Sequence, residues 1–241
     1  MAKANKFIPF LIFLALTAAS CSTVPKKPVT APVPPPGRST VKHVVGPGET
    51  LWRISKIYDV PAAAILQANS LKSRNLAMGS TLRIPKAKDA EQPITLYPSR
   101  KWKYIIIHHS ATKKGSSLAF NKAHQAKGWD MVGYDFIIDN GSGGKPDGFI
   151  EITPRWLKQL DGAHCKASDM NSKAIGICLV GDFNEDRLSF AQRRSLDELV
   201  NKLRAYYKIP GKNILRHGEV RGAHTDCPGK KFPWEKFKHG L

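Results

Sequence analysis

The chain has 241 residues, and its 38 Lys and Arg residues against 19 Asp and Glu residues give a formal net charge of +19 at pH 7. Hydrophobic residues make up 41% of the chain, which excludes a wholly disordered protein. No apolar run reaches the roughly 18 residues of a transmembrane helix, which excludes a polytopic membrane protein. The 4 cysteines are too few for a disulfide-stapled miniprotein. The positive charge favours an anionic partner or surface.

The N-terminal residues have the layout of a secretory signal peptide. Lys3 and Lys6 form a short basic region, an apolar stretch follows, and small residues precede Cys21. The end of this segment resembles a bacterial lipobox, although Ala18 stands where such motifs usually carry leucine. The resemblance implies that Cys21 is lipidated and anchors the protein to a membrane without spanning it, and Ser22 favours the outer membrane. The alternative is a plain signal peptide that is cleaved before Cys21.

A proline-rich stretch follows, with the sequence VPKKPVTAPVPPPG at residues 24–37. Proline fixes φ and has no N–H, so this stretch cannot join a sheet or a helix interior. We expect an extended, semi-rigid tether behind the anchor. A PxxP ligand for a partner domain is the alternative.

The next region predicts a small module with the order β-α-α-β. A strand is expected at residues 43–45, a helix from Glu49 or Thr50, a second helix from Pro61, and a closing strand at residues 81–84. The segments VVGPGETLWRISKIYDV, ILQANSL and LAMGSTLRIP resemble a LysM module. The resemblance implies binding of glycans that contain N-acetylglucosamine, as in peptidoglycan or chitin, through loops of the module.

The C-terminal region alternates strand and helix patterns after a linker with few apolar side chains. Expected strands are residues 104–107, 134–138, 149–152 and 174–180, and helices are expected from Ser116 or Ser117 to about Lys127 and after the capping box Ser189-x-x-Gln192. These elements predict an α/β domain, in which helices flank a mixed central sheet.

Three polar residues of this domain suggest a metal site. His108 ends a very apolar strand, His217 follows Ile214-Leu215-Arg216, and Cys227 precedes Pro228-Gly229. Imidazole and thiolate are the ligands that zinc prefers, and three protein ligands with an open fourth position are typical of catalytic zinc. Spacing alone does not bring the three together, because no single helix carries them.

The segments YIIIHHSAT, GWDMVGYDFIID, DGAHC, NSKAIGICLVGDF, RHGEV and TDCPG occur in this order. They resemble the family shared by phage lysozyme-type N-acetylmuramoyl-L-alanine amidases and peptidoglycan recognition proteins. The resemblance implies an amidase/peptidoglycan recognition protein-like fold and a zinc ion on His108, His217 and Cys227. It also implies that zinc-activated water cleaves the amide between N-acetylmuramic acid and the L-alanine of the stem peptide. Non-enzymatic members typically lack the cysteine, which is present here.

The same resemblance implies further site residues. Tyr134 and Thr225 are the expected catalytic residues, which orient the water or stabilise the oxyanion. Cys178 stands where some relatives carry a catalytic glutamate, so Tyr134 is the better candidate for a proton role. His164 and Asn171 are expected to line the substrate groove.

Two further expectations concern His109 and the cysteines Cys165 and Cys178. His109 should orient the ligands or pack, because adjacent strand residues face opposite ways. Cys165 and Cys178 could close a disulfide in an oxidising periplasm, or Cys178 is a buried small apolar residue.

We expect five segments: a signal peptide (1–20), the tether (21–40), the LysM module (41–86), a linker (87–101) and the amidase domain (102–241). The expected partners are peptidoglycan and, through the lipid on Cys21, a membrane of the bacterial cell envelope, on its periplasmic side. The signatures of nucleic-acid binding are missing, and we expect a monomer. Two rival hypotheses stay open: a non-catalytic peptidoglycan tether, and a peptidase with Cys227 as nucleophile, against which the following Pro228-Gly229 turn argues.

Overall fold

A computed structural model of the protein describes residues 39–88, 92–99 and 101–241. The expected signal peptide, Cys21 and all but the last two residues of the tether lie outside the described residues. All described residues belong to one compact unit, Gly37–Leu241. In this part of the chain, no helix combines the length and the apolar character that crossing a membrane requires.

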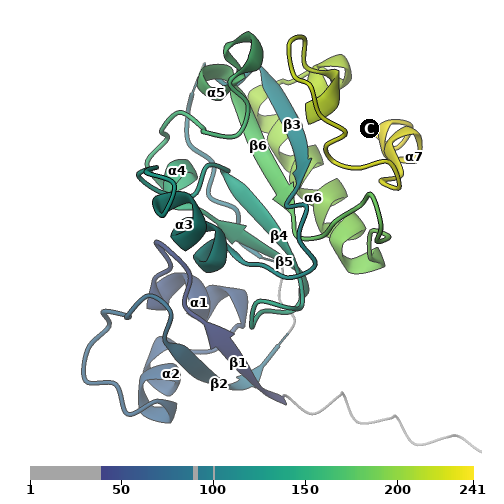
Figure 1. The fold of residues 1–241 in the computed structure, drawn as a ribbon. Coiled ribbons are helices and arrows are strands. Elements are labelled where there is room, and N and C mark those ends of the chain that lie inside the picture. The colour runs from purple at the N-terminus through teal and green to yellow at the C-terminus, as the bar shows by residue number, and fades with distance from the viewer. Residues whose placement is uncertain (1–38, 89–91, 100) are drawn as a thin grey trace, which may run out of the picture. The chain divides into compact units, whose positions relative to one another are not determined.

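The first described region has the predicted β-α-α-β order. Strand β1 (Ser39–Val44) pairs antiparallel with β2 (Thr81–Ala87), and α1 (Leu51–Ile57) and α2 (Ala62–Ala68) lie between them in the chain (Figure 1). The hydroxyl of Thr50 accepts a hydrogen bond from Arg53 N and so begins α1. Both strands are longer than predicted because the ladder continues past an irregularity, where Ser39 pairs with Ala87.

The apolar residues of the two helices and the closing strand form the core of this module. Leu51, Ile54, Ile65, Leu82 and Ile84 are buried together. The amide of Asn69 joins α2 to β2: its Nδ2 donates to Ile65 O and Arg83 O, and its Oδ1 accepts from Arg83 N. The central asparagine of the LysM pattern therefore has a structural role.

The second region is built on a five-stranded mixed sheet with the order β5-β4-β6-β3-β7. The strands are β3 (Tyr104–His109), β4 (Phe136–Asn140), β5 (Asp147–Ile152), β6 (Ala174–Leu179) and β7 (Ile214–Arg216). Strand β5 runs antiparallel to β4, while β3 pairs in parallel with both β6 and β7. The predicted α/β class with a mixed sheet is confirmed, whereas the three-residue β7 was not predicted.

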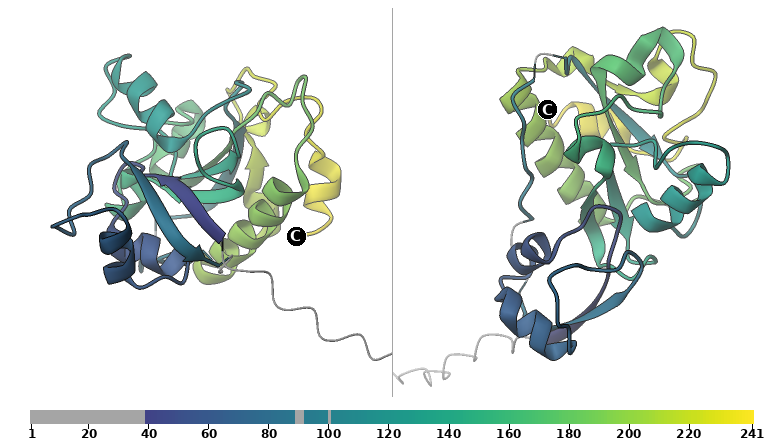
Figure 2. Two further views of the ribbon diagram at one scale, coloured as in Figure 1. Left: turned by 90° about the horizontal axis from the view of Figure 1, so that it is seen from below. Right: turned by 90° about the vertical axis from the view of Figure 1, so that its left-hand side faces the viewer.

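Helices cover both faces of this sheet, as the two views of Figure 2 show. Helix α6 (Phe190–Tyr207) packs its buried stripe, which includes Leu196, Leu199 and Leu203, on one face, and Ser189 caps it by accepting from Gln192 N. Helix α3 (Ser117–Gln125) lies over the other face. The short helices are α4 (Pro154–Leu157), α5 (Met170–Lys173) and α7 (Trp234–Lys238).

The alternation of side chains along β3 determines which face of the sheet His108 lies on. Ile105 and Ile107 belong to the core that α6 covers, whereas Ile106 belongs to a separate cluster with Cys165 and Met170. His108, like Ile106, therefore faces away from α6.

A buried charged cluster joins the β-α-α-β module to the sheet domain. The ammonium of Lys145 lies 3.0 Å from Glu49 Oε2, and it also pairs with Glu151 Oε2. The three side chains are only 1%, 3% and 2% exposed, respectively. Phe149 of β5 packs with the core of the β-α-α-β module. We call Glu49, Lys145 and Glu151 the lysine cluster.

Candidate metal centre

The structure brings together the three residues that the sequence suggested as metal ligands. One ligand atom each of His108, His217 and Cys227 lies within 4.8 Å of the others. Strand pairing explains the meeting of the two histidines, because β3 aligns Ile107 with Arg216 of β7, and a histidine follows each of these two residues in the chain. The two imidazole centroids are 4.5 Å apart.

The loop that carries Cys227 is held against the end of β3. Cys227 Sγ lies 3.7 Å from His108 Nδ1 and accepts the backbone N–H of His109 at 3.4 Å. The carbonyl of Cys227 accepts Gly218 N–H at 2.9 Å, which ties the loop to the turn that contains His217. Burial raises the pKa of the Cys227 thiol to about 12, although the bond from His109 opposes this shift. A bound cation would lower this pKa and favour the thiolate.

The two imidazoles of the centre are neutral at pH 7. Burial, followed by the neighbouring imidazoles of His164 and His217, holds the pKa of His108 well below its usual range. Burial also lowers the pKa of His217. Neutral imidazoles have a free lone pair, and with a thiolate they form a donor set that suits zinc. The chemistry of these residues therefore fits the metal that the sequence suggested.

Tyr134 and Thr225 both lie beside this centre. The Tyr134 ring is 5.3 Å from that of His108 between centroids. Burial, followed by Cys178 and Cys227, raises the pKa of Tyr134 well above its usual value, so its phenol keeps a proton that it can donate. Thr225 is exposed, and its hydroxyl oxygen accepts Cys227 N–H at 3.1 Å, which leaves the hydroxyl hydrogen free to donate.

His164 and Asn171, which were expected to line a substrate groove, make contacts within the protein. His164 is buried behind His108, and its two ring nitrogens lie 3.0 Å from His108 Nε2 and 3.3 Å from Ala174 O. Asn171 Oδ1 accepts the backbone N–H groups of His164 and Cys165. Both ring nitrogens of His164 are thus engaged inside the protein, and Asn171 fixes the segment that carries it.

His109, Cys165 and Cys178 pack within the fold. His109 turns away from the centre, and its Nδ1 accepts Phe183 N–H at 3.1 Å, as strand alternation predicts. Cys165 and Cys178 are both free and buried, so the structure contains no bridge between them.

Two aromatic residues near Tyr134 were not identified from the sequence. The ring of His124 lies 5.9 Å from that of Tyr134 and 4.5 Å from that of Trp129, which is 40% exposed. The partial exposure of Trp129 beside these rings is the signal that marks the two residues, and it appears only once burial is known.

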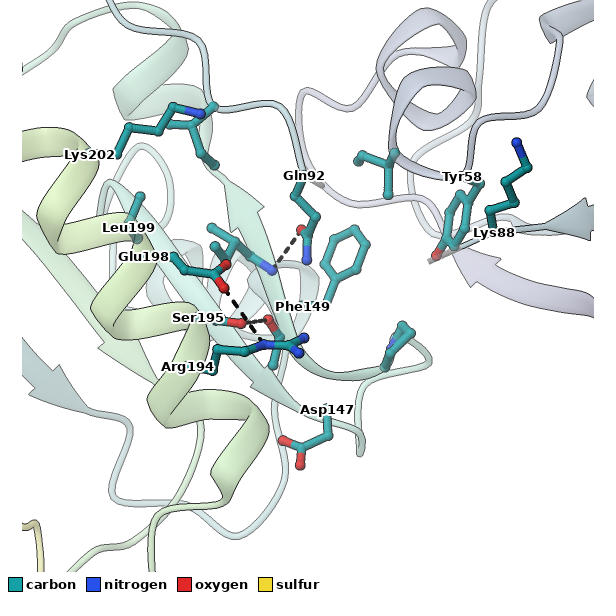
Figure 3. A pocket seen from close by; sticks show the side chains of 15 residues that line it. Tyr58, Lys88, Gln92, Asp147, Phe149, Arg194, Ser195, Glu198, Leu199 and Lys202 are labelled. Carbon is teal, nitrogen blue, oxygen red and sulfur yellow. Dashed lines mark hydrogen bonds and ion pairs between the residues drawn. The ribbon is translucent and has the colours of Figure 1, made fainter. Parts of the chain in front are cut away.

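A cavity of about 760 Å³ lies elsewhere, beside α6 and β5 (Figure 3). Its polar lining is engaged within the protein: Gln92 accepts Ile150 N–H, Ser195 donates to Gly148 O, and Arg194 pairs with Glu198 at 3.7 Å. None of the candidate site residues lines this cavity.

Comparisons with known proteins agree with the two regions of the fold. Residues 98–230 match the N-acetylmuramoyl-L-alanine amidase family, and residues 43–85 match the LysM domain. The endolysin of Escherichia phage T7 is 36% identical over 143 residues, which are 55% of this chain and 85% of the endolysin. Peptidoglycan-recognition protein SC2 of Drosophila simulans is 31% identical over 144 residues, or 56% of this chain and 72% of that protein. A solved endolysin amidase from Clostridium intestinale is 31% identical with a TM-score of 0.50, and the match covers 58% of this chain and 82% of that one.

Proposed function

Since the chain belongs to the N-acetylmuramoyl-L-alanine amidase family, we propose that it is a zinc-dependent peptidoglycan hydrolase that cleaves the amide between N-acetylmuramic acid and the L-alanine of the stem peptide. The observation that carries the proposal is the convergence of His108, His217 and Cys227 within 4.8 Å. This donor set leaves a fourth coordination position open. A zinc ion held there would polarise the scissile carbonyl and lower the pKa of a bound water.

Side chains beside the metal centre can stabilise the oxyanion and transfer a proton. The Tyr134 phenol keeps its proton at neutral pH and can donate a hydrogen bond to the developing oxyanion. The Thr225 hydroxyl is a second, uncharged donor on the exposed side of the centre. Residue 178 is a cysteine and supplies no carboxylate. Tyr134 is therefore also the group that can relay a proton: its phenol would give its proton to the leaving amine of L-alanine and take up the proton that the attacking water loses.

Binding and anchoring complete the proposal. The LysM module would hold the glycan strand, and the basic excess of the chain suits a wall rich in carboxylates.

Lipidation at Cys21 would hold the protein at the outer membrane, on its periplasmic side. Replacement of Cys21 by serine should then abolish incorporation of labelled fatty acid and release the protein from membranes. Unchanged labelling in that variant would disprove the anchor.

Two rival functions make different demands on Cys227. Similarity to a peptidoglycan recognition protein supports a non-catalytic binder, which needs no zinc chemistry. A cysteine peptidase needs a readily ionised thiol, whereas burial raises the pKa of Cys227 to about 12. The peptidase is therefore the weaker rival.

A peptidoglycan digest with metal analysis on the same sample tests the proposal. The wild type should contain about one zinc per chain and release stem peptides with new L-alanine amino termini from intact glycan strands. Cys227→Ala should lose zinc and peptide release while it still binds peptidoglycan through the LysM module. Cys165→Ala is the matched control, because it removes another buried free thiol outside the three-residue centre. Zinc-loaded wild type that binds peptidoglycan without releasing peptides would leave the binder hypothesis standing.

A further inference from the structure

The two ring nitrogens of His108 face different partners. Nε2 lies 3.0 Å from His164 Nδ1, and both rings are buried. Nδ1 lies 3.7 Å from Cys227 Sγ, on the side where the ligand atoms converge. A neutral imidazole carries a hydrogen on one nitrogen and a lone pair on the other. The position of that hydrogen therefore decides whether Nδ1 can bind a metal.

The carbonyl of Ala174 fixes the hydrogen of His164. It lies 3.3 Å from His164 Nε2, and a carbonyl oxygen can only accept. The Nε2 of His164 is consequently the donor, and its Nδ1 presents a lone pair to His108. His108 then donates from Nε2, which leaves the Nδ1 lone pair directed toward Cys227.

The fold leaves a fitted space for the His164 ring. A Cβ atom at Gly162 or at Gly176 would lie 2.4 Å from His164 Cδ2, so only glycine fits at either position. The Asn171 amide oxygen accepts the His164 backbone N–H at 2.9 Å and so holds the segment that carries the ring. The ring cannot turn without disturbing β6, which contains Gly176.

We propose that His164 is a positioning residue for the metal centre: it accepts the Nε2 hydrogen of His108 and so keeps the Nδ1 lone pair of His108 free for zinc. This inference rests on the proposed zinc site. A histidine ligand commonly donates its second N–H to a carboxylate or a carbonyl group. A neutral imidazole in that place fixes the ring without adding negative charge, so two imidazoles and one thiolate leave the zinc site with a net positive charge.

Zinc affinity, measured by chelator competition on the purified protein, tests this role without reference to activity. His164→Phe keeps the ring shape but removes the acceptor, and it should weaken zinc binding about 10–100-fold. His164→Asn can present its amide oxygen near the place of Nδ1, so it should retain most of the affinity. His43→Phe is the matched control, because His43 is also buried but contacts Tyr58 and Glu49 in the LysM module. It should leave zinc affinity unchanged.

Nitrogen NMR of the zinc-free wild type gives a second readout that does not depend on a variant folding. The His108 and His164 rings should both carry their hydrogen on Nε2. A hydrogen on Nδ1 of His108, or equal zinc affinity of His164→Phe and wild type, would overturn the inference while the proposed function stands. Failure of the wild type to bind zinc would instead refute the proposed function, and the inference with it.

Discussion

Replacement of Lys145 by methionine is expected to destabilise the folded protein strongly although it lies outside the metal centre. Lys145 is a buried cation between two buried carboxylates, Glu49 and Glu151. Methionine has a similar volume and keeps the contact with the surrounding apolar atoms. The variant therefore removes the charge and leaves the two carboxylates without their shared partner.

The size of the effect follows from what each carboxylate retains. Removal of one partner of a buried ion pair typically costs about 3–5 kcal/mol. Glu49 still has His43 Nε2 at 2.9 Å and the Gly46 N–H at 2.6 Å, and Glu151 still accepts the Ser117 hydroxyl at 2.6 Å. Because both carboxylates keep hydrogen-bond donors, we expect the free energy of unfolding to fall by an amount near the lower end of this range, about 3 kcal/mol at pH 7.

Urea denaturation at pH 7 measures this loss as a change in the free energy of unfolding. Lys113→Met is the control, because Lys113 is 72% exposed and lies 3.7 Å from Glu185, and such a surface pair contributes about 0–1 kcal/mol. A loss below about 1 kcal/mol for Lys145→Met would refute the reasoning, since the buried carboxylates would then need no cation.

The pH dependence gives an independent check on the same variant. Burial works to raise the pKa of Glu49, but the bond from His43 and the charge of Lys145 together lower it from 4.5 to about 2. A lowered pKa in the folded state stabilises the protein above pH 4.5, and this stability is lost as the pH falls toward 2. The difference between wild type and Lys145→Met should therefore shrink over that range, and a difference that stays constant would contradict the role of Glu49.

Two further predictions concern Asp139 and Tyr134. Burial, followed by the charge of Glu151, raises the pKa of Asp139 well above 3.8, so wild-type stability falls as the pH rises above that value. Asp139→Asn removes this loss, so the unfolding temperature of the variant relative to that of the wild type should rise from pH 4 to pH 8. A difference in unfolding temperature that does not depend on pH would count against a protonated Asp139. Tyr134→Phe should lower kcat about 100–1,000-fold with zinc content unchanged, as measured by turnover of soluble muropeptides, and an unaltered kcat would remove Tyr134 from the mechanism.

The sequence predicts the long elements well because their patterns are local. The apolar stripe of α6 and its Ser189 cap are set by residues within a few positions of one another. Strand β3 is a continuous apolar run, as expected for a strand buried on both faces. Strand β7 could not be predicted in this way, because three residues carry no periodicity and its pairing with β3 involves distant residues.

The candidate site was predictable only through family motifs. His108 and His217 meet because β3 and β7 pair, which spacing alone does not reveal. His164 was expected at a substrate groove, but its burial depends on the space left by Gly162 and Gly176. Lys145 stands in a glycine-rich turn that suggests solvent exposure, and its partner Glu49 is 96 positions away in the chain.

The lysine cluster and the candidate metal centre differ in how their buried polar groups are compensated. The lysine cluster contains its own cation, so its carboxylates are compensated when the chain folds. The centre at His108, His217 and Cys227 consists of two neutral imidazoles and a thiol. Burial lowers the pKa of both histidines and raises the pKa of the cysteine, so the imidazoles stay neutral and the thiol keeps its proton. Three converging donors of this kind gain stability only when a cation from outside replaces the thiol proton. Zinc should therefore raise the unfolding temperature of the wild type and leave that of Cys227→Ala unchanged, and a shift of equal size in both would place the bound ion elsewhere.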